Sequence, residues 1–296
     1  MAGGESVSRW KRVALWMMVA LYVLGRICQQ YPETIPVLLI VALQVVPPAV
    51  FALIHASILY RVRGMWVFTL SCVAAAGLCE SLSLRTGFPF GHYFFTGLMG
   101  PKIFDLPVLL VMAYLGIGYC SWVLAVLILG YRDEPLSGTR VVALPLLASA
   151  IMVAWDVSMD PIWATLDRAW IWRDGGVYFG VPISNFLGWY LTAYLFNQAF
   201  AFYLRSNQAV ARPMSSALWR GAVAIYTICA LGNLLVFRRG LFAPTGTDAS
   251  GRVWATTDIL AASVLVSLLV MTPFAVLAWA RAERAERHDQ ELSRSA

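Results

Sequence analysis

Long apolar segments recur along the whole chain and constrain its fold more than any other feature. A membrane-spanning helix needs about 20 mainly apolar residues, and eight segments approach or exceed that length. They are residues 13–30, 35–60, 65–83, 107–130, 141–158, 183–204, 217–237 and 259–280. The sequence therefore predicts an all-α fold, a polytopic integral membrane helical bundle with about eight transmembrane helices.

The polar residues are too few and too scattered to form a separate soluble domain. Of the 296 residues, 60% are hydrophobic and 13% are charged, whereas a soluble domain is about 45–50% apolar and about 25% charged. We therefore expect one membrane domain over 1–296. Residues 1–12 are predicted to form a cytoplasmic N-terminus, and residues 281–296 a charged cytoplasmic tail.

The distribution of lysine and arginine predicts the orientation of the bundle. With eight helices, 14 of these residues fall on the side of the two termini and 8 on the other side. Both termini are therefore expected in the cytoplasm, in a bacterial plasma membrane. The segments 84–106, 156–182 and 238–258 should then meet at the opposite face. Because the net charge of +6 comes from short runs beside apolar segments, we expect no nucleic acid partner.

The motifs that the chain lacks narrow its chemistry. The five cysteines fall within apolar segments without a CxxC pair, so we interpret them as core residues and expect no metal. No phosphate-binding loop, dinucleotide-binding glycine pattern, HExxH or GxSxG motif occurs, and three scattered histidines cannot form a multi-histidine iron site. We therefore expect no cofactor, and acid–base chemistry on a lipid-soluble substrate remains.

A polar and aromatic segment interrupts the apolar pattern between Trp155 and Trp189. Asp156 and Asp160 are four residues apart, so on a helix their carboxylates share one face and can converge on a cavity. Pro161 disfavours helical backbone at Asp160. In the alternative, the two carboxylates are interfacial groups that cap a helix or pair with nearby arginines.

The aromatic residues of this segment are candidates for the wall of a binding pocket. Carboxylates and glycines alternate with the aromatic residues Trp155, Trp170, Trp172, Tyr178 and Trp189. This pattern suits a pocket for an extended apolar ligand, and aromatic faces there would stabilise a cation. The alternative for each tryptophan is an anchor at the membrane interface. Asn185 lies about one turn inside the next helix, where its amide needs a partner from a neighbouring helix, a substrate or water.

A second polar segment precedes the fourth apolar run. Glu80 lies near the end of the third predicted helix and could face the same cavity as Asp156. His92 and Tyr93 follow in the sequence TGFPFGHYFFT. His92 is a candidate proton carrier, and the alternative is a histidine that is merely hydrogen-bonded at the interface. The candidate substrate-binding residues are thus Trp155, Trp170, Trp172, Tyr178, Asn185, Trp189, Tyr93 and His92.

The combined pattern resembles the membrane carotenoid 1',2'-hydratases, the bisanhydrobacterioruberin hydratase family. The resemblance covers about residues 80–200. It rests on Asp156, Asp160-Pro161, Trp170-Ile171-Trp172, Gly176 to Pro182, Asn185 to Trp189, Thr86 to Tyr93 and Leu106-Pro107. It implies a carotenoid biosynthesis enzyme that adds water across the terminal C1',2' double bond of an acyclic carotenoid, giving a tertiary alcohol.

The residues supply a mechanism that fits this reaction. Protonation at C2' by a carboxylic acid places positive charge on the tertiary C1', which water then captures. Burial in an apolar cavity helps a carboxyl group to hold its proton near neutral pH. Asp156 is the first candidate for the acid, and Asp160 or Glu80 for the group that positions or deprotonates water. Asn185 and Tyr93 are candidates to orient the water.

The partners considered are the acyclic carotenoid, membrane lipids and other enzymes of the carotenoid pathway. Four further functions remain as alternatives. A UbiA-type prenyltransferase needs two aspartate-rich motifs for Mg²⁺, but only one aspartate pair stands here. A carotenoid cyclase begins with the same protonation and ends without water. The non-enzymatic alternatives are a carotenoid-binding membrane module and a transporter, although no internal repeat favours the latter.

Overall fold

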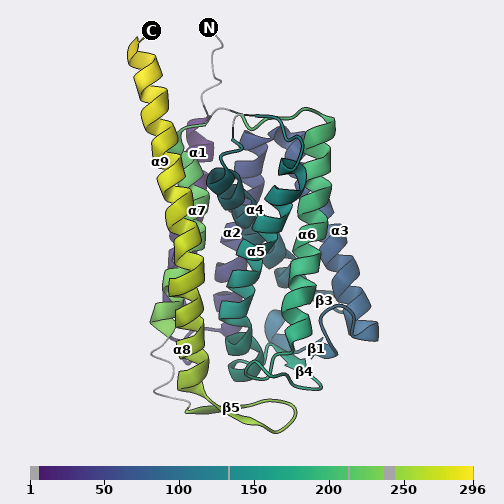
Figure 1. The fold of residues 1–296 in the computed structure, drawn as a ribbon. Helices are drawn as coiled ribbons and strands as arrows, with labels where there is room; N and C mark the ends of the chain where they lie inside the picture. Colours follow the sequence, from purple (N-terminus) through teal and green to yellow (C-terminus); the bar gives the residue numbers. More distant parts are fainter. Residues whose placement is uncertain (1–6, 133, 213, 237–243, 296) are drawn as a thin grey trace.

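The computed structural model describes residues 7–132, 134–212, 214–236 and 244–295. It is a bundle of long helices with short strands gathered toward one end (Figure 1). The helices are α1 (Arg9–Cys28), α2 (Val37–Leu59), α3 (Arg61–Thr86), α4 (Val108–Leu129), α5 (Arg140–Pro161), α6 (Ile183–Ser206), α7 (Ser216–Val236), α8 (Thr256–Val266) and α9 (Thr272–Ser295).

A long helix lies at each of the eight positions predicted from the sequence, because α8 and α9 continue into one another through the π-helical turn η4 (Ser267–Met271). Within the described ranges, six helices are long and apolar enough to cross a membrane. They are Val37–Leu59, Arg61–Thr86, Val108–Leu129, Arg140–Leu166, Ser216–Val236 and Thr256–Arg284. The helices α1 and α6 are outside this set, so the bundle supports a membrane protein with six such helices.

The helix α4 forms the centre of the bundle and contacts α2, α3, α5, α7 and α9. Its side chains are buried on nearly every side, which explains why its sequence is apolar throughout rather than on one stripe. Gly116 lets α4 approach α2 closely, since a Cβ atom there would lie 2.7 Å from Cβ of Pro48.

Two prolines inside α5 leave backbone carbonyls without a helical partner, and side chains from elsewhere supply one. Pro145 frees the carbonyl of Val141, which accepts a hydrogen bond from Nε2 of Gln198 at 3.1 Å. Pro161 frees the carbonyl of Val157, which accepts from the hydroxyl of Tyr178 at 3.3 Å. The helix can therefore continue past Pro161 into the π-helical turn η2 (Ile162–Leu166).

Three short antiparallel ribbons modify the all-α expectation. They pair β1 (Tyr93–Phe95) with β4 (Trp170–Trp172), β2 (Lys102–Ile103) with β3 (Leu106–Pro107), and β5 (Thr245–Thr247) with β6 (Val253–Ala255). Each strand has only two or three residues, which is too short to give a strand pattern in the sequence, and β1–β4 forms only when two distant segments pair.

The ribbons β1–β4 and β5–β6 lie at the end of the bundle opposite the start of α1 and the end of α9 (Figure 1). Arg252 joins two of the segments at this end by donating from Nη2 to the carbonyl of Gly176 at 2.7 Å. The predicted meeting of the segments 84–106, 156–182 and 238–258 is confirmed for the described residues; residues 238–243 of the third segment lie outside them.

Cytoplasmic termini, expected from the distribution of lysine and arginine, predict which exposed positions a membrane-impermeant thiol reagent reaches. In a Cys28→Ser background, we expect Val177→Cys to be labelled in intact spheroplasts, because Val177 is 70% exposed at the ribbon end. We expect Asn207→Cys, exposed at the other end of α6, to be labelled only after the membrane is opened. Labelling in the reverse order would contradict cytoplasmic termini.

Candidate active site

Three carboxylates are buried together in the part of the bundle next to the ribbons. Glu80 comes from α3, and Asp156 and Asp160 come from α5; their exposed fractions are 4%, 0% and 1%. Carboxylates buried among apolar helices cost free energy unless they receive hydrogen bonds. Their donors therefore define the site.

Glu80 accepts two hydrogen bonds from phenol groups. The hydroxyl of Tyr114 on α4 donates to Oε1 at 2.7 Å, and the hydroxyl of Tyr93 on β1 donates to Oε2. The Tyr114 ring stacks on Trp189 with ring centroids 4.1 Å apart, which fixes the direction of its hydroxyl. Burial and the nearby Glu80 carboxylate raise the pKa of Tyr93 well above its usual value, so this phenol stays a donor.

The two aspartates share the amide of Asn185, which lies one turn into α6. Nδ2 of Asn185 donates to Oδ2 of Asp156 at 3.1 Å and also to Oδ2 of Asp160. The indole Nε1 of Trp170 on β4 donates to Oδ1 of Asp160 at 2.8 Å. Among the residues that the structure describes, Oδ1 of Asp156 has no hydrogen-bond partner.

This arrangement decides between the two interpretations of Asp160. Because α5 continues through Pro161, Asp160 keeps helical backbone and shares a face with Asp156. Its two oxygen atoms accept from Trp170 and Asn185 instead of pairing with an arginine or capping a helix end. The guanidinium of Arg173 lies over the ring of Phe94, 5.8 Å from its centroid.

A cavity with an empty volume of about 280 Å³ adjoins the carboxylates; we call it the carboxylate cavity. Its polar wall consists of Glu80, Asp160, Asn185 and Tyr93. Its remaining wall is aromatic apart from Leu110 and consists of Phe90, Phe95, Trp170, Trp172, Trp189 and Leu110. Carboxyl, amide and phenol groups thus face a small space whose other walls are apolar.

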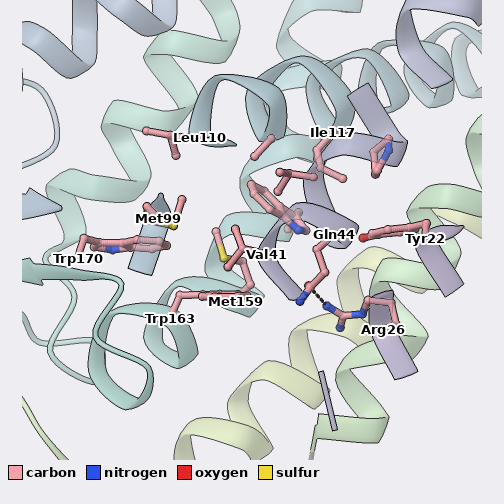
Figure 2. Close-up of a pocket in the computed structure, with 14 residues that line it drawn as sticks. Tyr22, Arg26, Val41, Gln44, Met99, Leu110, Ile117, Met159, Trp163 and Trp170 are labelled. Carbon is pink, nitrogen blue, oxygen red and sulfur yellow. Dashed lines mark hydrogen bonds between the residues drawn. The ribbon is translucent and has the colours of Figure 1, made fainter. Parts of the chain in front are cut away.

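A second, larger pocket has an empty volume of about 610 Å³; we call it the apolar pocket. Leu110 and Trp170 line both the apolar pocket and the carboxylate cavity. Figure 2 shows Trp170, Met99 and Leu110 on one side of the apolar pocket and Tyr22, Arg26 and Gln44 on the other. Trp155 and Met159 of α5 also line it. An extended apolar molecule in this pocket would reach the carboxylates past Trp170.

The structure places most of the predicted site residues around these two spaces. Glu80, Asp160, Tyr93, Trp170, Trp172, Asn185 and Trp189 line the carboxylate cavity, and Trp155 lines the apolar pocket. Asp156 belongs to the same hydrogen-bonded cluster but is not among the residues that line the cavity.

Two predicted residues lie outside. The side chain of His92 is 57% exposed and its Nδ1 lies 3.3 Å from Oδ2 of Asp174. Successive residues of an extended strand point to opposite faces, so Tyr93 turns inward and His92 outward. Tyr178 packs its ring on Phe179 and Phe186 and donates to the carbonyl freed by Pro161, so its contacts stabilise the backbone beside the site.

Tyr114 is a member of the carboxylate cluster that the sequence analysis missed. It lies inside the apolar run of α4, with no polar neighbour in sequence to mark it. The only available signal was a fully buried phenol in a membrane helix, which needs a hydrogen-bond partner. In addition, no group of three or more His, Cys, Asp or Glu side chains is placed to hold a metal ion in the described part of the chain.

The part of the chain that contains the candidate site is also the part that matches known proteins. Residues 32–249 match the family model described as carotenoid biosynthesis protein. The chain belongs to this family. All residues of the carboxylate cavity fall within the matched region, whereas Arg26 and the helix formed by α8 and α9 lie beyond it.

A curated relative adds a narrower comparison. Over 114 residues the chain is 32% identical to a bisanhydrobacterioruberin hydratase from Haloarcula japonica. That match covers 38% of this chain and 36% of the relative, so it spans about a third of the relative's length. No solved structure matches the chain significantly.

The sharing of Asn185 by two aspartates predicts a large effect of a small substitution. Asn185→Asp removes the common donor and buries a further carboxylate beside Asp156 and Asp160, so we expect a loss of about 3 kcal/mol in stability. Thermal unfolding of the purified protein in detergent measures it. Asn207→Asp is the control, since Asn207 is exposed. Equal melting temperatures for Asn185→Asp and wild type would contradict the arrangement.

Proposed function

We propose that this protein adds water across the terminal C1',2' double bond of an acyclic carotenoid and produces a tertiary alcohol. The observation that supports the proposal is that a small cavity lined by buried carboxylates lies next to a larger apolar pocket, with Leu110 and Trp170 lining both. Membership of the carotenoid biosynthesis family and the similarity to a hydratase support the substrate class and the reaction.

The two spaces suit different parts of such a substrate. The polyene lies in the apolar pocket, where burial of its apolar surface provides the binding free energy. Its terminal isoprenoid unit passes Leu110 and Trp170 and enters the carboxylate cavity. There the terminal double bond lies beside the polar side chains of the cavity wall, Glu80, Asp160, Asn185 and Tyr93.

Asp160 is our choice for the acid, because it lines the cavity while Asp156 lies behind Asn185. The sequence analysis favoured Asp156 as the acid, and we assign a role to each of the two aspartates. Oδ1 of Asp156 has no partner among the described residues, which leaves room for a proton. Asn185 holds the two carboxyl groups at one site, so a proton is shared between them and Asp160 delivers it to C2' of the substrate.

The cation that forms at C1' is stabilised by its surroundings. Trp172, Phe90 and Phe95 line the cavity, and aromatic faces attract positive charge. The carboxylate that Asp160 becomes after proton transfer adds electrostatic stabilisation in a site that excludes bulk water.

Glu80 is our choice for the group that handles water. Tyr93 and Tyr114 hold its carboxylate in one orientation at the cavity wall. A water molecule on Glu80 attacks C1', forms the C–O bond and loses one proton to Glu80. Return of that proton from Glu80 to Asp160, which lines the same cavity, restores both groups, so the net change is the addition of one water molecule.

Isosteric substitutions test these roles in a lycopene-producing bacterium. We expect the wild-type protein to convert lycopene to an alcohol heavier by one water. Asp160→Asn and Glu80→Gln should each lower the yield about 100-fold or more, as expected for removing an acid or base. Asp156→Asn should also lower it, because the shared proton is lost. Pigment extraction, chromatography and mass spectrometry measure the yield.

Asp174→Asn is the matched control, since its carboxylate lies on the surface beside His92. Full yield from Asp160→Asn, with the protein present in the membrane, would refute our choice of acid. A product of unchanged mass would indicate a cyclase instead. Loss of activity on adding a chelator would favour metal-dependent prenyl transfer.

A further inference from the structure

Arg26 is a buried cation at the side of the apolar pocket away from the carboxylate cavity (Figure 2). Its exposed fraction is 5%. No carboxylate pairs with it among the residues that the structure describes; its guanidinium bonds only to neutral groups. Ionisable side chains in apolar bundles are costly, and an unpaired one marks a candidate binding site.

The surroundings of Arg26 hold the guanidinium in one position. Nη2 donates to Oδ1 of Asn233 at 2.6 Å and to the carbonyl of Cys229 at 3.3 Å. Asn233 is itself oriented, because its Nδ2 donates to Oγ of Ser267 at 2.8 Å and to Oγ of Ser158 at 3.2 Å. The cation is therefore built into the junction of α1, α5, α7 and η4 rather than left free to turn.

Gln44 on α2 extends this group toward the pocket. Its Oε1 accepts from Nη1 of Arg26 at 2.8 Å, which directs its amide nitrogen elsewhere. Within the described residues, neither Nε2 of Gln44 nor Nε of Arg26 has a hydrogen-bond partner. Both side chains line the apolar pocket, together with Tyr22. This side of the pocket thus offers two unused N–H donors and a positive charge.

We propose that Arg26 and Gln44 bind an oxygen-bearing group, a carbonyl, hydroxyl or carboxylate, on the polyene that occupies the apolar pocket. One oxygen atom there would receive the unused donor of Gln44 and lie next to the guanidinium. The preferred ligand is then a linear polyene with an unsaturated isoprenoid end in the carboxylate cavity and an oxygenated group at a fixed distance along the chain. That this ligand is a carotenoid rests on the proposed function.

A role in packing alone does not account for the group. The bonds to Asn233, Cys229 and Gln44 join the helices, but a neutral donor would do the same without burying a charge. Nor would packing explain why the unused donor belongs to a residue that lines the pocket.

Binding of chain-length variants tests the proposal. The probes are lycopene and a series of apo-lycopenals and apo-lycopenoic acids, which keep one isoprenoid end and carry oxygen at different distances. Trp155, Trp163 and Trp170 line the pocket, so quenching of tryptophan fluorescence in the purified protein reports the Kd. We expect one chain length to bind roughly tenfold more tightly than lycopene, as for one charge-assisted hydrogen bond.

The substitution Gln44→Glu should abolish this preference. Glutamate has nearly the same shape as glutamine and still pairs with Arg26. It neutralises the charge of the guanidinium and removes the unused N–H donor of the amide. Gln44→Leu, which also removes the donor, provides a second measurement. Gln208→Glu, at an exposed position outside the pocket, is the control and should retain the preference.

Equal Kd values for all probes, or a preference that survives in Gln44→Glu and Gln44→Leu, would overturn the proposal. So would a phospholipid that purifies with the wild-type protein, is lost in Gln44→Glu and accompanies no preference among polyenes, because the site would then hold a lipid headgroup. If no probe gains water but the preference appears and is lost on substitution, the proposed hydration fails and this inference stands.

Discussion

The burial of three carboxylates in an apolar bundle is the constraint on which the rest of the structure depends. Glu80, Asp156 and Asp160 would destabilise the bundle if they lacked donors, and the donors come from four different elements, α4, α6, β1 and β4. The carboxylates therefore also fix the positions of elements that contribute only hydrogen-bond donors. Tyr114 illustrates this, because its phenol holds Glu80 while its ring stacks on Trp189.

The irregular backbone near the site serves the same arrangement. Pro161 would ordinarily end α5, but the hydroxyl of Tyr178 satisfies the carbonyl that the proline frees, and the helix continues through η2. The chain then returns as β4 and pairs with β1. This pairing sets Trp170 and Trp172 beside Tyr93 at the cavity wall. Trp170 also lines the apolar pocket, so the two spaces share this residue.

The sequence predicted the helices well because length and hydropathy are local properties. It also predicted that Glu80 could face the same cavity as Asp156, since the order of the helices brings their ends to one side; in the structure Asp160, not Asp156, lines the cavity with Glu80. It could not place His92 and Tyr93 on opposite faces, because the strand forms only when β4 pairs with β1. The role of Arg26 was likewise hidden. The sequence analysis counted it as a topological charge, whereas packing against Gly232 and Asn233 buries it.

Isotopic labelling tests whether the carboxylate cavity adds water to the end of an acyclic carotenoid. Membranes containing the protein would be incubated with lycopene in water enriched in ¹⁸O, and the pigments analysed by mass spectrometry. We expect a tertiary alcohol whose single new oxygen atom is ¹⁸O from the solvent. A product without new oxygen, or with oxygen from another source, would contradict it.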